Sequence, residues 1–250
     1  MDVGLRDKFV QLWAQYFDGA DLPLCLYYSD DEAYRQHLRP SKGHTCMIGR
    51  LVSVRKGETL AFDQDSVPCG GGKKYMGFST TAMPYFEYFL SCGIPGKLEG
   101  ERYKKTPEIV RETRANAPQM EAPAKYAVFK RWDKLDAVDE PEVVIFFATP
   151  DVLSGLFTLS NFDETDPNAV IAPFGAGCGL IVQYPYLEKD KERPRSIIGM
   201  FDVSARPFVP GSTISFATPM VKFARMVENM GESFLITGSW AKVQRRIESS

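Results

Sequence analysis

A single cysteine followed by three glycines is the part of this sequence best suited to chemistry. Cys69 precedes Gly70, Gly71 and Gly72, and two lysines follow. A backbone without side chains allows a ligand to approach closely, and its amides can converge on an anion or a thiolate. A helix beginning here, with lysines nearby, would favour the thiolate of Cys69. The stretch therefore predicts a redox thiol, a metal ligand or a nucleophile.

The alternative for Cys69 is packing, because free cysteine is among the most frequently buried residue types. Three consecutive glycines lose much backbone entropy on folding, so they favour a functional turn over simple packing. A similar turn occurs later, where Cys178 lies between Gly177 and Gly179 after a short apolar run and a proline. The repetition would fit an internally duplicated half-domain, and chance explains it equally well. For Cys178, function and packing are equally good interpretations.

A metal site would need cysteines from separate segments. Cys46 follows His44 by two residues, and such a pair can supply two ligands. The closely spaced cysteine pairs typical of structural zinc and iron–sulfur sites do not occur in the sequence. A metal or iron–sulfur cofactor would therefore require Cys46, Cys69 and Cys178 to converge. The other two cysteines, Cys25 and Cys92, have apolar neighbours and are predicted to lie in the core.

The same glycine-rich turn could instead bind an anion. Its amides, together with Lys73 and Lys74, would suit a phosphate or carboxylate at a helix start. The sequence has neither the P-loop spacing nor the dinucleotide-binding glycine pattern. A solvated turn with two exposed lysines is the simpler interpretation.

Arg206 is a further candidate for binding a carboxylate. If its segment is a strand, alternation places Asp202, Ser204 and Arg206 on one face. A planar guanidinium beside a carboxylate and a hydroxyl could hold a carboxylate-bearing ligand. A surface salt bridge on an edge strand is the alternative.

Other catalytic patterns are weak. His37 and His44 are the only histidines, and no nucleophile-elbow pattern accompanies them. The aromatic run from Tyr85 to Phe89 could line a flat cofactor pocket, but core packing explains it better.

Composition narrows the class of protein. The 250 residues are 44% hydrophobic and 25% charged, as expected for a globular chain. Thirty basic and 32 acidic residues give a net charge of −2, so we expect no nucleic-acid partner. The most apolar run, residues 143–148, is too short to cross a membrane. Five cysteines do not suggest a secreted disulfide framework, and reduced thiols in the cytoplasm are expected.

The hydrophobic pattern predicts an α/β or α+β fold: a mixed sheet with helices packed on it, in one domain spanning residues 1–250. A helix is expected over residues 3–17, and another is expected to start at Thr106. The continuous apolar run 143–148, followed by a helix pattern, predicts a strand buried on both faces and parallel pairing somewhere in the sheet. Further strands are expected near residues 22–28, 59–62, 126–129, 170–172, 196–202 and 213–217, and further helices near residues 46–56 and 218–230.

Several short motifs in the same order resemble domain-of-unknown-function family 169, over about residues 22–243. They are Cys46 with Cys69, Cys69-Gly70-Gly71, Phe174 to Cys178, Asp202 to Pro207, Phe216 to Pro219, Ser233 to Leu235, and Trp240. The resemblance implies an uncharacterised, cytoplasmic, cysteine-containing protein of the kind found in anaerobic bacteria and archaea, with no assigned reaction. Members often have Cys-Pro-Gly-Gly and an alanine-rich helix at this turn, so the resemblance implies no role for Lys73 or Lys74.

The leading hypothesis is a protein that binds a small molecule or a metal-containing cofactor at Cys69 and Gly70–Gly72, with Cys178 nearby. One alternative is a non-catalytic module that binds an anionic metabolite, a phosphate or a carboxylate, with the help of Arg206. Another is a thiol oxidoreductase using Cys69 and Cys178. The residues do not decide whether the protein is an enzyme.

Overall fold

The strands form one mixed sheet. The structure, a computed structural model, describes residues 1–40, 43 and 45–249, so His44 lies outside the described residues. Within this part, seven strands are ordered β2-β3-β1-β4-β7-β6-β5, and all neighbours are antiparallel except β5 and β6. The strands are β1 (Leu24–Ser29), β2 (Leu60–Phe62), β3 (Tyr126–Arg131), β4 (Val143–Ala148), β5 (Val170–Ile171), β6 (Ser196–Gly199) and β7 (Ile214–Pro219). The expected mixed sheet with a parallel pair is confirmed.

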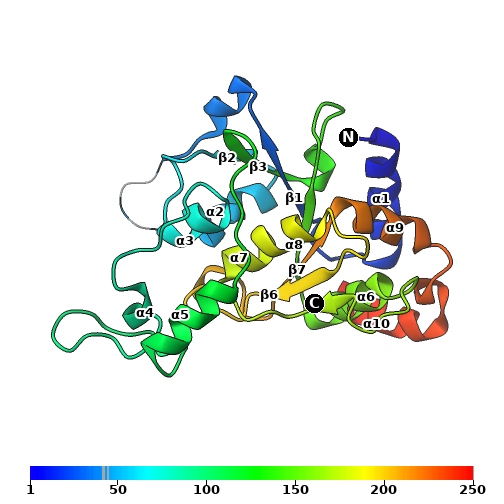
Figure 1. Cartoon of the computed structure of the whole chain (residues 1–250). Helices are drawn as coiled ribbons and strands as arrows, with labels where there is room; N and C mark the ends of the chain where they lie inside the picture. Colours follow the sequence, from blue (N-terminus) through cyan, green and yellow to red (C-terminus); the bar gives the residue numbers. More distant parts are fainter. Residues whose placement is uncertain (41–42, 44, 250) are drawn as a thin grey trace.

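Helices cover both faces of the sheet (Figure 1). One layer consists of α1 (Val3–Tyr16), α6 (Pro150–Ser160), α9 (Met220–Asn229) and α10 (Gly238–Glu248). The other consists of α2 (Met47–Arg55), α3 (Gly70–Tyr75), α7 (Gly177–Ile181) and α8 (Gln183–Glu188). Short 3₁₀ turns are η1 (Glu32–His37), η2 (Trp132–Lys134), η3 (Arg206–Phe208) and η4 (Phe234–Ile236). The cysteines of interest all belong to the α2, α3 and α7 side.

Strand β4 holds the two layers together. Its side chains alternate, so that Val144 and Phe146 join the core under α1 and α9, whereas Ile145 and Phe147 join the core under α2 and α7. Every residue of β4 is buried. The prediction of a strand buried on both faces is therefore confirmed.

Residues 79–117 form an arm that extends away from the sheet and carries α4 (Phe86–Phe89) and α5 (Pro107–Asn116) (Figure 1). The aromatic run expected in the core is here: Tyr85 is 49% exposed, and none of residues 86–89 is fully buried. Cys92, on the same arm, is exposed, so its predicted burial is wrong; Cys25 is buried in the main core, as predicted. Local apolar composition could not reveal that α4 packs on α5, outside the sheet.

The two similar turns do not extend into a repeated sheet. β2, before the first turn, lies at one edge and is antiparallel to its neighbour. β5, before the second, lies at the other edge and is parallel to its neighbour. The similarity is therefore confined to the turns and the helices that follow them.

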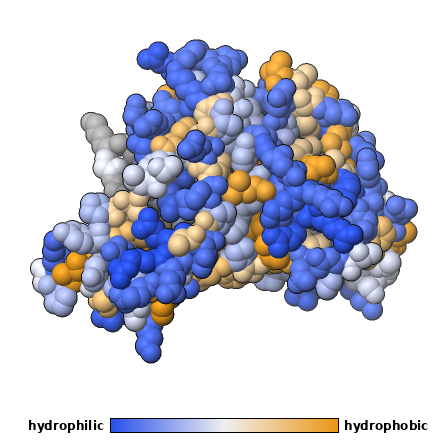
Figure 2. All heavy atoms as spheres, viewed as in Figure 1, coloured by the Kyte–Doolittle hydropathy of each residue, from blue (hydrophilic) through white to orange (hydrophobic). Residues whose placement is uncertain are grey.

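The molecular surface is mostly polar on the face drawn in Figure 2, where hydrophobic residues form small separate patches. Among the described residues, none of the helices combines the length and the apolar character that a membrane crossing requires.

A buried carboxylate ties the β3–β4 connection to the sheet. Asp139 is fully buried and accepts hydrogen bonds from Lys130 Nζ at 3.0 and 2.9 Å and from the Asp136 amide at 2.7 Å. The Tyr27 and Tyr34 hydroxyls also donate to it. Burial opposes ionisation of Asp139, but these hydrogen bonds outweigh burial and hold its pKa below the ordinary value.

We expect Asp139→Asn to lower the free energy of unfolding by about 3 kcal/mol, because it leaves Lys130 without its buried counter-ion. Asp136→Asn removes only the exposed partner of the same lysine and should cost less than about 1 kcal/mol. The Asp139 contribution is present above the pKa of an unfolded aspartate, about 3.9, and is lost as the pH falls through the lowered folded value. Urea unfolding at neutral and acidic pH measures both effects. Equal losses in the two variants at neutral pH would contradict this account.

Candidate thiol site

Three cysteines from distant segments come together on the α2, α3 and α7 side of the sheet. Cys46 immediately precedes α2, Cys69 immediately precedes α3, and Cys178 is the second residue of α7. Helix α7 packs on both α2 and α3. The Cys178 sulfur lies 3.8 Å from the position that a Cβ on Gly71 would take. All three cysteines are partly buried against the same core, and we call them the thiol site.

Cys69 caps the helix that it precedes. Its backbone is extended (φ −147°, ψ 152°), and its sulfur accepts a hydrogen bond from the Gly72 amide at 3.3 Å. The sulfur thus takes the place of the oxygen that a serine or aspartate would supply at an N-cap. Among the described residues, the amides of Gly70 and Gly71 have no protein acceptor.

The other two thiols are held in their neutral forms. Burial raises the pKa of Cys178 well above its ordinary value, and electrostatic interactions with the nearby Cys69, Cys46 and Asp202 raise it further. Burial also raises the pKa of Cys46, although hydrogen bonds from the Ile48 and Gly49 amides act in the opposite direction. Any ligand that binds these sulfurs as thiolates must therefore release protons on binding.

Glycines allow the helices to approach closely enough to bring the thiols together. A Cβ on Gly72 would lie 3.0 Å from Met47 Cβ and 3.1 Å from Val67 Cγ1. A Cβ on Gly179 would lie 3.0 Å from the Tyr75 ring. Such distances are shorter than ordinary van der Waals contact, so side chains at these positions would push α3 away from α2 and α7.

Asp202 lies at the thiol site, whereas the sequence pattern linked it with Arg206 and not with the cysteines. Its Oδ2 accepts a hydrogen bond from the Gly177 amide at 3.3 Å, so a carboxylate occupies the start of α7. Its Oδ1 accepts from the Ser204 amide and hydroxyl at 3.1 and 2.8 Å. The Asp-x-Ser spacing is a turn signal that could have indicated this loop, but not its position beside the cysteines.

Arg206 lies in the turn η3, so the strand that was expected to align it with Asp202 and Ser204 is wrong, and its role in ligand binding stays a prediction. Strand β6 ends at Gly199, so no strand alternation reaches Arg206. Instead, its guanidinium donates to the carbonyl oxygens of Thr213 at 2.5 Å and Gly211 at 2.7 Å, which closes the loop before β7. All acceptors of this side chain therefore belong to its own loop.

Two surface clefts lie away from the thiol site. One surface cleft, of about 520 Å³, is lined by residues that include Tyr28, Glu142 and Met220. A second cleft of similar volume lies within residues 92–102 of the arm. Neither cleft is lined by any of the three cysteines of the site.

The described side chains at the thiol site are not arranged around a single metal ion. Within the described part of the chain, no three His, Cys, Asp or Glu side chains are arranged to hold one ion.

Comparison with known proteins identifies a family for this chain. The model of DUF169, described as "Uncharacterised ArCR", matches residues 17–229. The chain belongs to this family. Comparisons with curated proteins and with solved structures found no match.

We expect Gly72→Ala to lower the free energy of unfolding by about 1–3 kcal/mol, because the added methyl group overpacks the contact with Met47 and Val67. Gly70→Ala is the matched control in the same helix. A Cβ there meets nothing within 4 Å, so stability should be unchanged or rise by about 0.5 kcal/mol. Urea unfolding compares the two variants. Equal stability would show that Gly72 is not needed for close packing.

Proposed function

We propose that this protein binds a metal-containing cofactor or a small molecule at the thiol site, with Cys46, Cys69 and Cys178 as the groups that hold it. The observation that supports the proposal is that each of these cysteines stands at the start of a helix, and that one of the three helices, α7, packs on both α2 and α3. Cysteines used only for packing can lie singly in a core, as Cys25 does.

Within this proposal, an iron–sulfur cluster is the preferred cofactor class. Thiolates are soft ligands that suit iron–sulfur clusters, whereas a mononuclear ion does not fit the donor set. A bound cluster would supply electron transfer or Lewis-acid chemistry. The chain's own groups would hold the cluster, and Asp202 would keep the start of α7 in place through the Gly177 amide. A cytoplasmic location suits the proposal, because reduced thiols persist there.

Two other functions use parts of the same turn. A non-catalytic module for an anionic metabolite is favoured by the Gly70 and Gly71 amides, which have no protein acceptor in the described structure. A thiol oxidoreductase is favoured by the position of Cys69 near Cys178, both of which are free thiols.

Anaerobic purification, followed by reconstitution with ferrous iron and sulfide, tests the cofactor proposal. We expect bound iron and visible absorption in the wild-type protein and in Cys92→Ser, whose thiol is exposed on the arm. Cys69→Ser and Cys178→Ser should each lower the bound iron more than about tenfold. Circular dichroism establishes that the variants are folded.

The cofactor proposal would be contradicted if the protein stays colourless and metal-free. It would also be contradicted if Cys69→Ser and Cys92→Ser bind the same amount of iron. Phosphate binding that requires Gly70 and Gly71 but not Cys69 would support the anion module. A Cys69–Cys178 disulfide in peptide maps after mild oxidation would support the oxidoreductase.

A further inference from the structure

The arm lies outside both hydrophobic cores. Among the described residues, no member of either core belongs to residues 79–117. The two ends of the arm are joined at its base, where the Ala122 amide donates a hydrogen bond to the Gly77 carbonyl oxygen at 3.0 Å. Burial of apolar surface is the dominant favourable term in folding. Because the arm shares no apolar core with the sheet, it can separate from the main body at a lower free-energy cost than the helices of the two layers.

Tyr103 and Lys104 belong to the structure of the arm itself. Their segment is joined to the end of α4 by backbone hydrogen bonds, in which the Glu101 amide donates to the Phe89 carbonyl oxygen at 2.7 Å and the Lys104 amide donates to the Leu90 carbonyl oxygen at 3.0 Å. Helix α4 in turn packs on α5. The two side chains would therefore move together with the arm.

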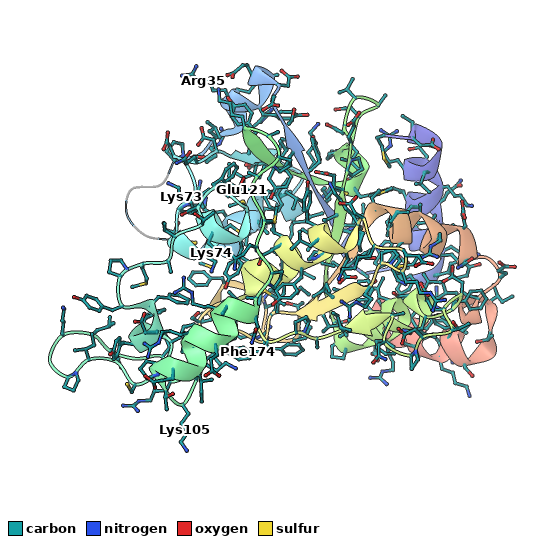
Figure 3. All side chains as sticks on the ribbon, viewed as in Figure 1. Arg35, Lys73, Lys74, Lys105, Glu121 and Phe174 are labelled. Carbon is teal, nitrogen blue, oxygen red and sulfur yellow. The ribbon has the colours of Figure 1, made fainter. Side chains whose placement is uncertain are left out.

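The same two side chains contact loops of the main body. The Ser204 amide donates a hydrogen bond to the Tyr103 hydroxyl at 2.9 Å. Lys104 Nζ lies 4.1 Å from the centre of the Phe174 ring, a cation–π contact. Phe174 lies beside α5, where the arm meets the main body (Figure 3). The arm is thus attached both to the loop before α7 and to the loop after β6.

Both loops lead to the start of α7, which carries Cys178. Phe174 precedes Cys178 by four residues. Asp202 Oδ1 accepts hydrogen bonds from the Ser204 amide and hydroxyl, and Asp202 Oδ2 accepts one from the Gly177 amide. Tyr103 therefore shares the Ser204 amide with the carboxylate that holds the first residue of α7.

We propose that the arm is a strap that closes against the start of α7 and controls access to Cys178. In the closed arrangement that the structure shows, Tyr103 and Lys104 hold the Ser204 and Phe174 loops in place. One hydrogen bond and one cation–π contact at the surface are weak enough to break reversibly. Opening would free the start of α7. This inference rests on the proposed function and deepens it, because it assigns a means of regulating ligand entry to the same site.

The test is the rate at which iodoacetamide alkylates each cysteine of the reduced protein, followed by peptide mapping. We expect Tyr103→Phe, which removes only the hydroxyl, to speed alkylation of Cys178 about threefold or more. Lys104→Gln should act in the same direction, because it removes the cation over Phe174. Tyr88→Phe, on α4 of the same arm, is the matched control and should react as the wild type does. Within the described structure, the Tyr88 hydroxyl has no hydrogen-bond partner.

Two cysteines of the same chain serve as internal references. Cys92, exposed on the arm, should react at the same rate in every variant, and Cys25, buried in the main core, should stay unreactive. The proposal is overturned if Cys178 reacts at the same rate in Tyr103→Phe and Tyr88→Phe. It is also overturned if Cys25 reacts faster in parallel with Cys178, because the whole protein would then be unfolding.

Hydrogen exchange follows the same opening without a thiol reagent. Amides at the start of α7, Gly177 among them, should exchange faster in Tyr103→Phe than in Tyr88→Phe, whereas those of β4 should exchange equally in both. Equal exchange at the start of α7 would overturn the proposal. Neither measurement needs a bound cofactor, so the strap and the cofactor proposal can fail independently of each other.

Discussion

The close approach of α3 to α2 and α7 is the constraint on which the thiol site depends. It is possible because Gly72 and Gly179 present no side chain where the neighbouring helices touch. Each of these helices begins at or next to a cysteine, so bringing the helices together also brings the sulfurs together. The glycines after Cys69 therefore act through packing at Gly72 and through accessible amides at Gly70 and Gly71. In this turn one glycine allows close helix packing, and the other two leave their backbone amides accessible.

The electrostatics of the site follow from this packing. Enclosure by the helices disfavours the thiolates of Cys46 and Cys178, and the Asp202 carboxylate adds to the effect. Asp202 also occupies the start of α7, where a free anion would otherwise be favoured. A ligand that carries positive charge and displaces protons suits such a site better than an anion does.

Much of the fold could be predicted from the sequence, because local patterns of residues indicate individual strands and helix starts. The apolar run of β4 indicated a strand buried on both faces, and the Thr106-Pro107 pair indicated the start of α5. The wrong predictions involved long-range packing. The exposure of Cys92 follows from the arm lying outside the sheet, which no local pattern reveals. Arg206 was misplaced because β6 ends before it, at a residue followed by Met200 with φ +68°.

The candidate site could be predicted only in part for the same reason. The sequence identified Cys46, Cys69 and Cys178 as the residues that would have to converge, but spacing along the chain could not show that they do. The sequence pointed to Asp202 as a partner of Arg206 and not of the cysteines, because its segment meets the start of α7 only in the folded chain. Residue type thus indicated which side chains could do chemistry, and tertiary packing determined which of them lie at the same site.

The most direct test of whether the cysteines lie close together is labelling with a trivalent arsenical. This reagent must bond two thiols to form a stable bridge. In the reduced wild-type protein, peptide mapping should show arsenic bridging Cys69 to Cys46 or to Cys178, with Cys25 and Cys92 unbridged. Absence of any bridge among Cys46, Cys69 and Cys178, in a protein that remains folded, would contradict the existence of a shared thiol site.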